Sequence, residues 1–159
     1  MSYWAHEWLG MAAGTNPPVI SGYDCGGLGE PCIHPFDLRY FRPEVSNTRA
    51  QFAKMLTLAR QWPQVTPSAP NISSVCDHYN SFEDVCSDAW SYALIETVKA
   101  HNGIDGYTCG GTGEPCNSRN DPYFRPGGTF TRGQMTKIID RSLTYDIGTP
   151  QPVLGWCTP

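Results

Sequence analysis

The sequence predicts a mainly α-helical protein built from two helix–loop–helix repeats, with long, disulfide-bridged, glycine-rich loops and little β structure. Three observations support this fold class: a duplicated loop segment, a helix pattern after each duplicate, and seven cysteines in a chain of 159 residues. Sixteen glycines and fourteen prolines, against only 16% charged residues, indicate short elements separated by turns.

The duplication is visible by direct comparison. Residues 22–32 read Gly-Tyr-Asp-Cys-Gly-Gly-Leu-Gly-Glu-Pro-Cys, and residues 106–116 repeat nine of these eleven positions. Tyr-Phe-Arg-Pro then occurs at 40–43 and 123–126, and Thr-Arg-x-Gln at 48–51 and 131–134. We therefore divide the chain into copy one (1–62), a proline-rich linker (63–75), copy two (76–145) and a proline-rich tail (146–159).

A helix is predicted after each loop. Thr48 and Thr131 are suited to be N-caps, because Gln51 and Gln134 three residues later complete capping boxes. Apolar residues follow at helical spacing, so helices are expected near 48–62 and 131–144. The apolar positions are Phe52, Met55, Leu56 and Ala59 in the first helix, and Met135, Ile138, Ile139 and Leu143 in the second.

A second helix is predicted before each loop. In copy two it spans 87–101 and places Trp90, Leu94 and Val98 on one face; in copy one it spans about 3–13. Aromatic residues at helical spacing are more often core than ligand-binding residues, so Trp8 is expected in the core. For Trp4 and Trp90 both readings remain open.

Five landmarks of copy two resemble, in order, the S-layer homology repeat. They are Phe-Glu-Asp-Val at 82–85, a helix from Trp90, Gly-Ile-Asp-Gly-Tyr at 103–107, Tyr-Phe-Arg-Pro at 123–126 and Thr-Arg-Gly-Gln at 131–134. Copy one is similar from Trp4 onward but lacks the Phe-x-Asp-Val opening. The loop insertion with its two cysteines resembles a longer-loop variant of these repeats.

This resemblance implies a module that anchors surface proteins non-covalently to cell-wall polysaccharide, which is held in grooves between repeats. It implies contacts to an anionic sugar from Arg49 and Arg132, with Trp4, Trp90, Gly22 and Gly106 as further groove residues. Solvated arginines paired with carboxylates are the alternative reading. The family's Thr-Arg-Ala-Glu glutamate is glutamine at positions 51 and 134, which puts an identical ligand in doubt.

Cys25 and Cys32, like Cys109 and Cys116, bracket six residues each, which favours local disulfides. This spacing is not typical of a zinc site, and no histidine lies at ligand spacing nearby. Cys76 and Cys86 form a third candidate pair, which leaves Cys157 free or bonded to another subunit. So many cysteines favour an oxidising, extracellular location.

No cofactor is expected. Four aspartates flank the loops and could bind calcium, but no complete calcium motif is present, so turn formation is the better reading. They are Asp24, Asp37, Asp105 and Asp121.

Other function classes find little support in the sequence. A net charge of −4 with scattered basic residues argues against nucleic-acid binding, and no apolar run is long enough to span a membrane. No nucleophile or metalloenzyme motif points to catalysis. Residues 1–6 lack the features of a signal peptide, so an export signal is expected outside this sequence.

Two functions remain. The first is a non-catalytic cell-surface module that binds cell-wall polysaccharide. The second is a structural subunit that assembles with copies of itself into an extracellular filament or S-layer, because a neighbouring chain could complete copy one.

Overall fold

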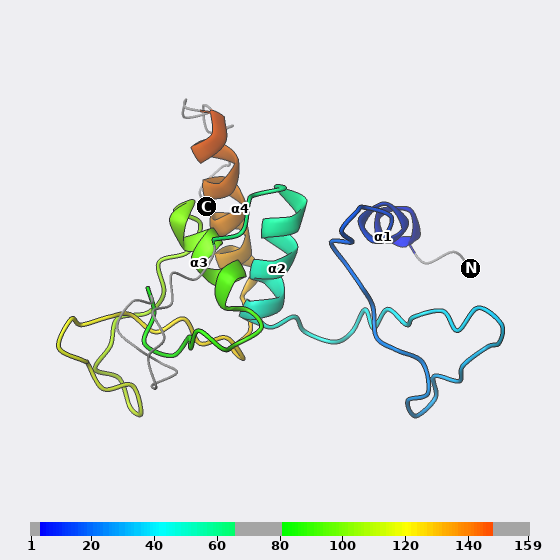
Figure 1. The fold of residues 1–159 in the computed structure, drawn as a ribbon, viewed down its shortest axis with the longest axis horizontal. Helices are drawn as coiled ribbons and strands as arrows, with labels where there is room; N and C mark the ends of the chain where they lie inside the picture. Colours follow the sequence, from blue (N-terminus) through cyan, green and yellow to red (C-terminus); the bar gives the residue numbers. More distant parts are fainter. Residues whose placement is uncertain (1–3, 66–80, 148–159) are drawn as a thin grey trace, which may run out of the picture.

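The computed structural model describes residues 4–65 and 81–147, which form four helices (Figure 1). These are α1 (His6–Ala13), α2 (Arg49–Ala59), α3 (Tyr92–Ala100) and α4 (Arg132–Ile147). The described residues form no strands, only isolated antiparallel bridges. The prediction of a mainly helical fold with little β structure is therefore confirmed. None of the described helices is both long and apolar enough to cross a membrane.

Both predicted capping boxes are present. The Thr48 hydroxyl accepts the Gln51 amide at 3.2 Å, and the Gln51 side chain accepts the Thr48 amide at 2.8 Å. The same two bonds join Thr131 and Gln134 at 3.2 and 3.0 Å. Because these bonds satisfy orphan amides of the first turn, α2 and α4 begin where the sequence predicts.

The helix before the second loop is shorter than the predicted 87–101. Two turns precede it: the Ala89 amide donates to the Cys86 carbonyl, and the Tyr92 amide donates to the Ala89 carbonyl. Trp90 therefore lies before α3 and is 64% exposed, while Leu94 and Val98 are buried. The prediction that Trp90 shares their helical face is wrong.

The hydrophobic core lies between α2 and α3, above the loop of copy two. Phe52 and Leu56 of α2 pack in one cluster with Ile95 and Val98 of α3. The same cluster includes Ile138 of α4 and the loop residues Phe82, Val85, Ile104 and Phe124. Thus α2, which the sequence assigns to copy one, completes the core of copy two.

α1 stands apart from this three-helix cluster (Figure 1, blue) and buries no residue. Trp8 is 64% exposed, so its predicted place in the core is wrong. The physical reason is that within the described residues no helix covers α1, whereas α3 is covered by α2. The chain after α1 turns back on it, since the Val19 and Ile20 amides both donate to the Ala12 carbonyl.

The two loops have the same backbone arrangement. Tyr23 pairs with Tyr40, and Tyr107 with Tyr123, each through two hydrogen bonds of 2.8 Å. The predicted disulfides Cys25–Cys32 and Cys109–Cys116 are both formed, with Cα atoms 5.0 Å apart.

Of the third predicted cysteine pair, only Cys86 lies within the described residues. Cys86 is disulfide-bonded. Its predicted partner Cys76 and the seventh cysteine, Cys157, lie outside the described residues, as do the predicted tail from residue 148 and the linker from residue 66.

Candidate functional site

Each loop is closed by an arginine of the Tyr-Phe-Arg-Pro motif. In copy two, the Arg125 guanidinium makes two bonds to the Glu114 carboxylate, at 2.7 and 2.8 Å, and lies 3.9 Å from the centre of the Tyr107 ring. This interaction accounts for three of the duplicated residues, because their counterparts in copy one interact in the same way. There Arg42 binds Glu30 at 2.8 and 2.7 Å and lies 4.1 Å from the Tyr23 ring.

These arginines also make the carboxyl groups of Glu30 and Glu114 more acidic. The hydrogen bonds from Arg42 and Arg125 lower the pKa of the Glu30 and Glu114 carboxyls below its ordinary value. The carboxylates are thus held in the charged form, which suits their role as acceptors in a bidentate pair.

Arg49, at the start of α2, is enclosed by the loop of copy two and only 4% exposed. Its guanidinium carbon lies 4.8 Å from the ring centres of Tyr107 and Phe124, and 4.4 Å from that of Phe130. It donates hydrogen bonds to the Phe124 carbonyl and, at 3.3 Å, to the Tyr107 hydroxyl. Burial lowers the pKa of Arg49, yet an arginine remains charged near neutral pH.

The backbone at the start of α2 strengthens this junction. The Arg49 amide donates to the Gly128 carbonyl at 2.7 Å, and the Ala50 amide to the Pro126 carbonyl at 3.0 Å. These first-turn amides have no acceptor within their own helix. The loop of copy two therefore satisfies the N-terminus of a helix that belongs to copy one in sequence.

The Phe-Glu-Asp-Val segment closes the other side of this loop. The Asp84 carboxylate accepts the amides of Phe124 and Arg125 at 2.7 and 2.6 Å. The Phe82 ring packs at 5.2 Å on Phe124 and so closely over Gly106 that a Cβ there would be 2.7 Å from it. Gly106, with a φ of +79°, is thus required by packing and by backbone conformation.

A groove of about 120 Å³ lies between this loop and α4. We call it the α4 groove. Arg49, Tyr107, Phe130, Gln134, Lys137 and Arg141 contribute to its lining, together with Asp105 and Gly106. The Gln134 side chain donates to the Tyr107 hydroxyl at 3.2 Å, which fixes one wall.

The α4 groove is rich in cations. Asp105 is its one carboxylate among the lining residues; Arg141 binds it, and Lys99 Nζ lies 3.9 Å away. The Arg141 hydrogen bond lowers the pKa of Asp105. Against this single negative charge stand Arg49, Lys137 and Arg141, so the lining has a net charge of +2 (three cations minus one anion). Such a surface attracts anions.

Copy one has a corresponding hollow of about 240 Å³ between its loop and the outer face of α2. We call it the copy-one hollow. Gly22, Tyr23, Gln51, Lys54 and Met55 line it, in the positions that Gly106, Tyr107, Gln134, Lys137 and Ile138 have in the α4 groove. The Lys54 ammonium donates to the Ser21 hydroxyl at 3.2 Å.

The six predicted glycan-binding residues fall into three groups. Arg49 and Gly106 line the α4 groove, and Gly22 lines the copy-one hollow. Arg132, Trp4 and Trp90 are exposed and line neither of them. Ligand contact by these residues stays a prediction, although the Arg49 guanidinium is mostly occupied by groups of this chain.

Sequence reasoning missed several residues of the α4 groove, among them Phe130, Lys137, Tyr107 and Arg141. Lys137 has a counterpart in Lys54, so extending the repeat alignment into the helices would have revealed it. Tyr107 lies within the duplicated loop segment, where its identity was noted but not its role. Arg141 replaces Leu58 and carried no signal.

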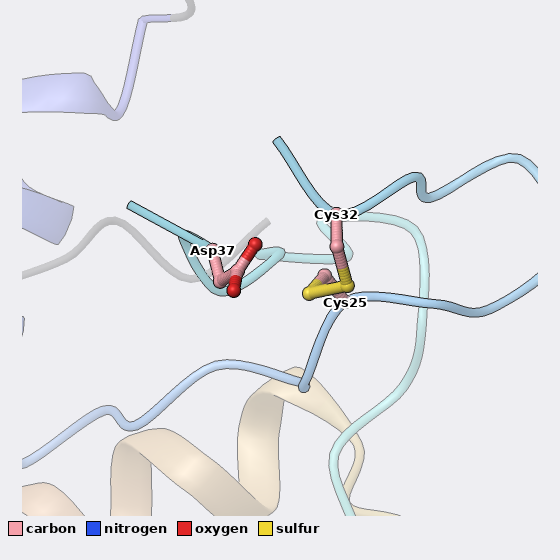
Figure 2. Close-up of side chains that lie close together, drawn as sticks. All are labelled: Cys25, Cys32 and Asp37. Carbon is pink, nitrogen blue, oxygen red and sulfur yellow. A yellow bond between two sulfur atoms is a disulfide. The ribbon is translucent and has the colours of Figure 1, made fainter. Parts of the chain in front are cut away.

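The only group of potential metal ligands near one another in the described part of the chain is Cys25, Cys32 and Asp37, with ligand atoms within 4.8 Å of one another (Figure 2). The two sulfur atoms form a disulfide and so cannot act as thiolate ligands. Asp37 lies instead 3.1 Å from the His34 imidazole. The geometry does not support a metal site here.

The four aspartates considered for calcium each face a basic side chain. Besides Asp37, Asp24 pairs with Arg39 at 3.1 Å, Asp121 accepts from Arg119 at 2.8 Å, and Asp105 binds Arg141. Calcium sites gather several oxygens around one point, whereas three of these carboxylates each pair with an arginine and the fourth, Asp37, faces His34.

The chain has no match among protein-family models, curated proteins or solved structures. The likeness to S-layer homology repeats therefore rests on the motifs themselves.

Proposed function

We propose that this chain is a non-catalytic cell-surface module that binds an acidic cell-wall polysaccharide in the α4 groove and thereby anchors surface protein. The observation that carries this proposal is the composition of the groove, with three cations around one carboxylate beside the polar Tyr107 and Gln134. Cations attract the acidic substituents of such a polymer, while hydroxyl and amide groups suit its sugar hydroxyls.

Two further features support the proposal. The Phe130 ring lines the same groove and offers an apolar surface to a sugar ring. The disulfides of both loops suit an oxidising, extracellular location.

The geometry of the α4 groove also bears on which of its residues contact the ligand directly. Arg49 supplies positive charge from the base of the groove, but its hydrogen bonds go to Phe124 and Tyr107. The direct contact to ligand is therefore assigned to Lys137, while Arg141, one helical turn further along α4, binds Asp105 and adds positive charge to the groove.

Binding of the purified chain to an immobilised acidic wall polysaccharide tests the proposal. Lys137→Ala removes one charge-assisted contact, worth roughly 1–2 kcal/mol, or about five- to thirtyfold in affinity. Lys54→Ala is the matched control, because Lys54 has the corresponding helix position in the copy-one hollow. Binding should weaken with added salt, since exposed charges are screened.

Three results would count against the proposal. They are equal binding by Lys137→Ala and the unaltered chain, equal loss for Lys54→Ala and Lys137→Ala, and equal binding to a neutral polysaccharide.

A further inference from the structure

The loops of copy one and copy two differ in whether an arginine from a helix packs against their aromatic rings. In copy two, an arginine from the preceding Thr-Arg-x-Gln motif is enclosed against the Phe124 carbonyl and the rings of Tyr107 and Phe124. Copy one has the counterparts Tyr23 and Phe41, which line the copy-one hollow. No arginine from another helix fills that hollow in the described structure, and Phe41 is 44% exposed.

The receiving backbone is also duplicated. In copy two, a turn closed by the Gly128 amide and the Arg125 carbonyl presents two carbonyls to α2. Copy one forms a turn with the same hydrogen bond, from the Val45 amide to the Arg42 carbonyl at 3.2 Å, although Arg125 has a φ of +59° and Arg42 has no positive φ. Its Pro43 and Val45 carbonyls correspond to the acceptors Pro126 and Gly128. The copy-one hollow thus retains two of the three rings and the two backbone carbonyls that receive Arg49 and its helix N-terminus in copy two, whereas Asn47 stands in place of the third ring, Phe130.

The chain carries a second, unused donor of the same type. Arg132 begins α4 after the same capping box as Arg49, but its side chain is exposed. The amides of Arg132 and Gly133 have no backbone acceptor within the part of the chain that the structure describes. α4 therefore presents the group that the copy-one hollow lacks.

We propose that Arg132 of one chain inserts into the copy-one hollow of a second copy of this chain, between Tyr23 and Phe41, so that chains join head to tail. The Arg132 guanidinium donates to the Phe41 carbonyl, and the first amides of α4 donate to the Pro43 and Val45 carbonyls. Within each chain, α2 makes the equivalent contacts with the loop of copy two, and the same chemistry would hold α4 of a second copy in the copy-one hollow.

The helix faces on either side of this contact fit the same scheme. Ile139 of α4 corresponds to Leu56, which α2 buries against α3, whereas Met135, the counterpart of Phe52, is partly buried against the core of its own chain. Ile139 is 43% exposed, and α1 of the second chain would offer Trp8 and Met11, which are 64% and 59% exposed. Burial of these apolar groups would stabilise the contact.

One difference limits its strength. Asp140 of α4 stands where α2 has the fully buried Thr57, and moving a carboxylate out of water costs more free energy than moving a hydroxyl. The contact is therefore confined to the first two turns of α4, and we expect a dissociation constant in the micromolar range or weaker. Because donor and acceptor lie on different parts of one chain, repetition of the contact extends into a filament unless it closes into a ring.

Analytical ultracentrifugation of the chain, with Cys157→Ser in every sample to exclude an intermolecular disulfide, tests the proposal. The average mass should rise above the monomer mass of 17.6 kDa with concentration. Arg132→Glu removes the donor and Phe41→Glu blocks the acceptor, so each alone should weaken association at least about tenfold. Circular dichroism confirms that both variants fold.

Mixing the two variants gives the decisive result. Arg132→Glu keeps an intact acceptor and Phe41→Glu an intact donor, so the mixture should form one-to-one dimers of about twice 17.6 kDa and nothing larger. The proposal is overturned if the unaltered chain stays monomeric up to about 1 mM, if either variant assembles normally, or if the mixture remains monomeric. The polysaccharide assay is independent of all three outcomes.

Discussion

Arg49→Ala is expected to destabilise the whole helical cluster, although the replaced residue lies in a motif that also occurs, exposed, at Arg132. Arg49 is 4% exposed and links α2 to the loop of copy two. Alanine removes a hydrogen bond from a charged donor, worth about 1.5–3 kcal/mol, and leaves the Phe124 carbonyl without this partner. It also removes ring contacts worth about 0.5–2 kcal/mol.

These contributions share the same atoms and do not simply add, so we expect a loss of about 3–4 kcal/mol in the free energy of unfolding. Arg132→Ala is the matched control. Because Arg132 is exposed, its replacement should cost less than about 0.5 kcal/mol in a dilute, monomeric sample. Arg49→Lys should fall between the two, since lysine retains the charge but not the planar guanidinium.

Urea unfolding followed by circular dichroism measures these differences, with disulfides intact in all samples. For a cluster of about 100 residues, 3 kcal/mol also corresponds to a melting temperature lower by more than about 10 °C. Equal stability of Arg49→Ala and Arg132→Ala would refute the reasoning, because it would mean that enclosure by three rings contributes nothing.

Two more predictions concern the loop of copy two. Gly106→Ala should lower the free energy of unfolding by about 2–4 kcal/mol, because its Cβ would lie 2.7 Å from the Phe82 ring. Gly113 also has a positive φ but no atom within 4 Å of its Cβ position, so Gly113→Ala should cost only about 1 kcal/mol. Thermal unfolding of the two variants measures this difference. Stability should decline as pH falls below 4.5, the ordinary pKa of Glu114, because the hydrogen bond from Arg125 lowers this pKa in the folded chain and the unfolded chain therefore binds the proton first. Glu114→Gln should make this decline shallower in urea titrations between pH 7 and 3. Equal costs at the two glycines, or an unchanged acid profile in Glu114→Gln, would contradict the respective arguments.

The sequence predicted the local features well. Thr48 and Thr131 cap helices as expected, and the cysteines of each duplicated loop are bonded to each other. Capping boxes and short cysteine spacings depend on residues a few positions apart, so a single sequence contains the whole signal.

Longer-range features could not be predicted in the same way. Trp8 and Trp90 have the spacing of core residues, but whether a helix face is covered depends on which partner packs against it. Likewise, Arg49 and Arg132 occupy identical motifs, and only the position of the next loop makes one of them a core residue. The sequence pattern therefore predicted equivalent roles for Arg49 and Arg132, whereas packing buries the first and leaves the second exposed.

The passage of α2 into the core of copy two has a consequence for how this chain can be divided. The boundaries of the sequence repeat and of the folded core differ by one helix, because α2 belongs to copy one in sequence but packs in the core of copy two. A fragment starting at residue 76, at the predicted domain boundary, would lack Arg49, Phe52 and Leu56 and so leave α3 uncovered. A fragment starting at residue 48 would keep every helix of the cluster, which makes the loop before α2, rather than the proline-rich linker after it, the natural place to cut.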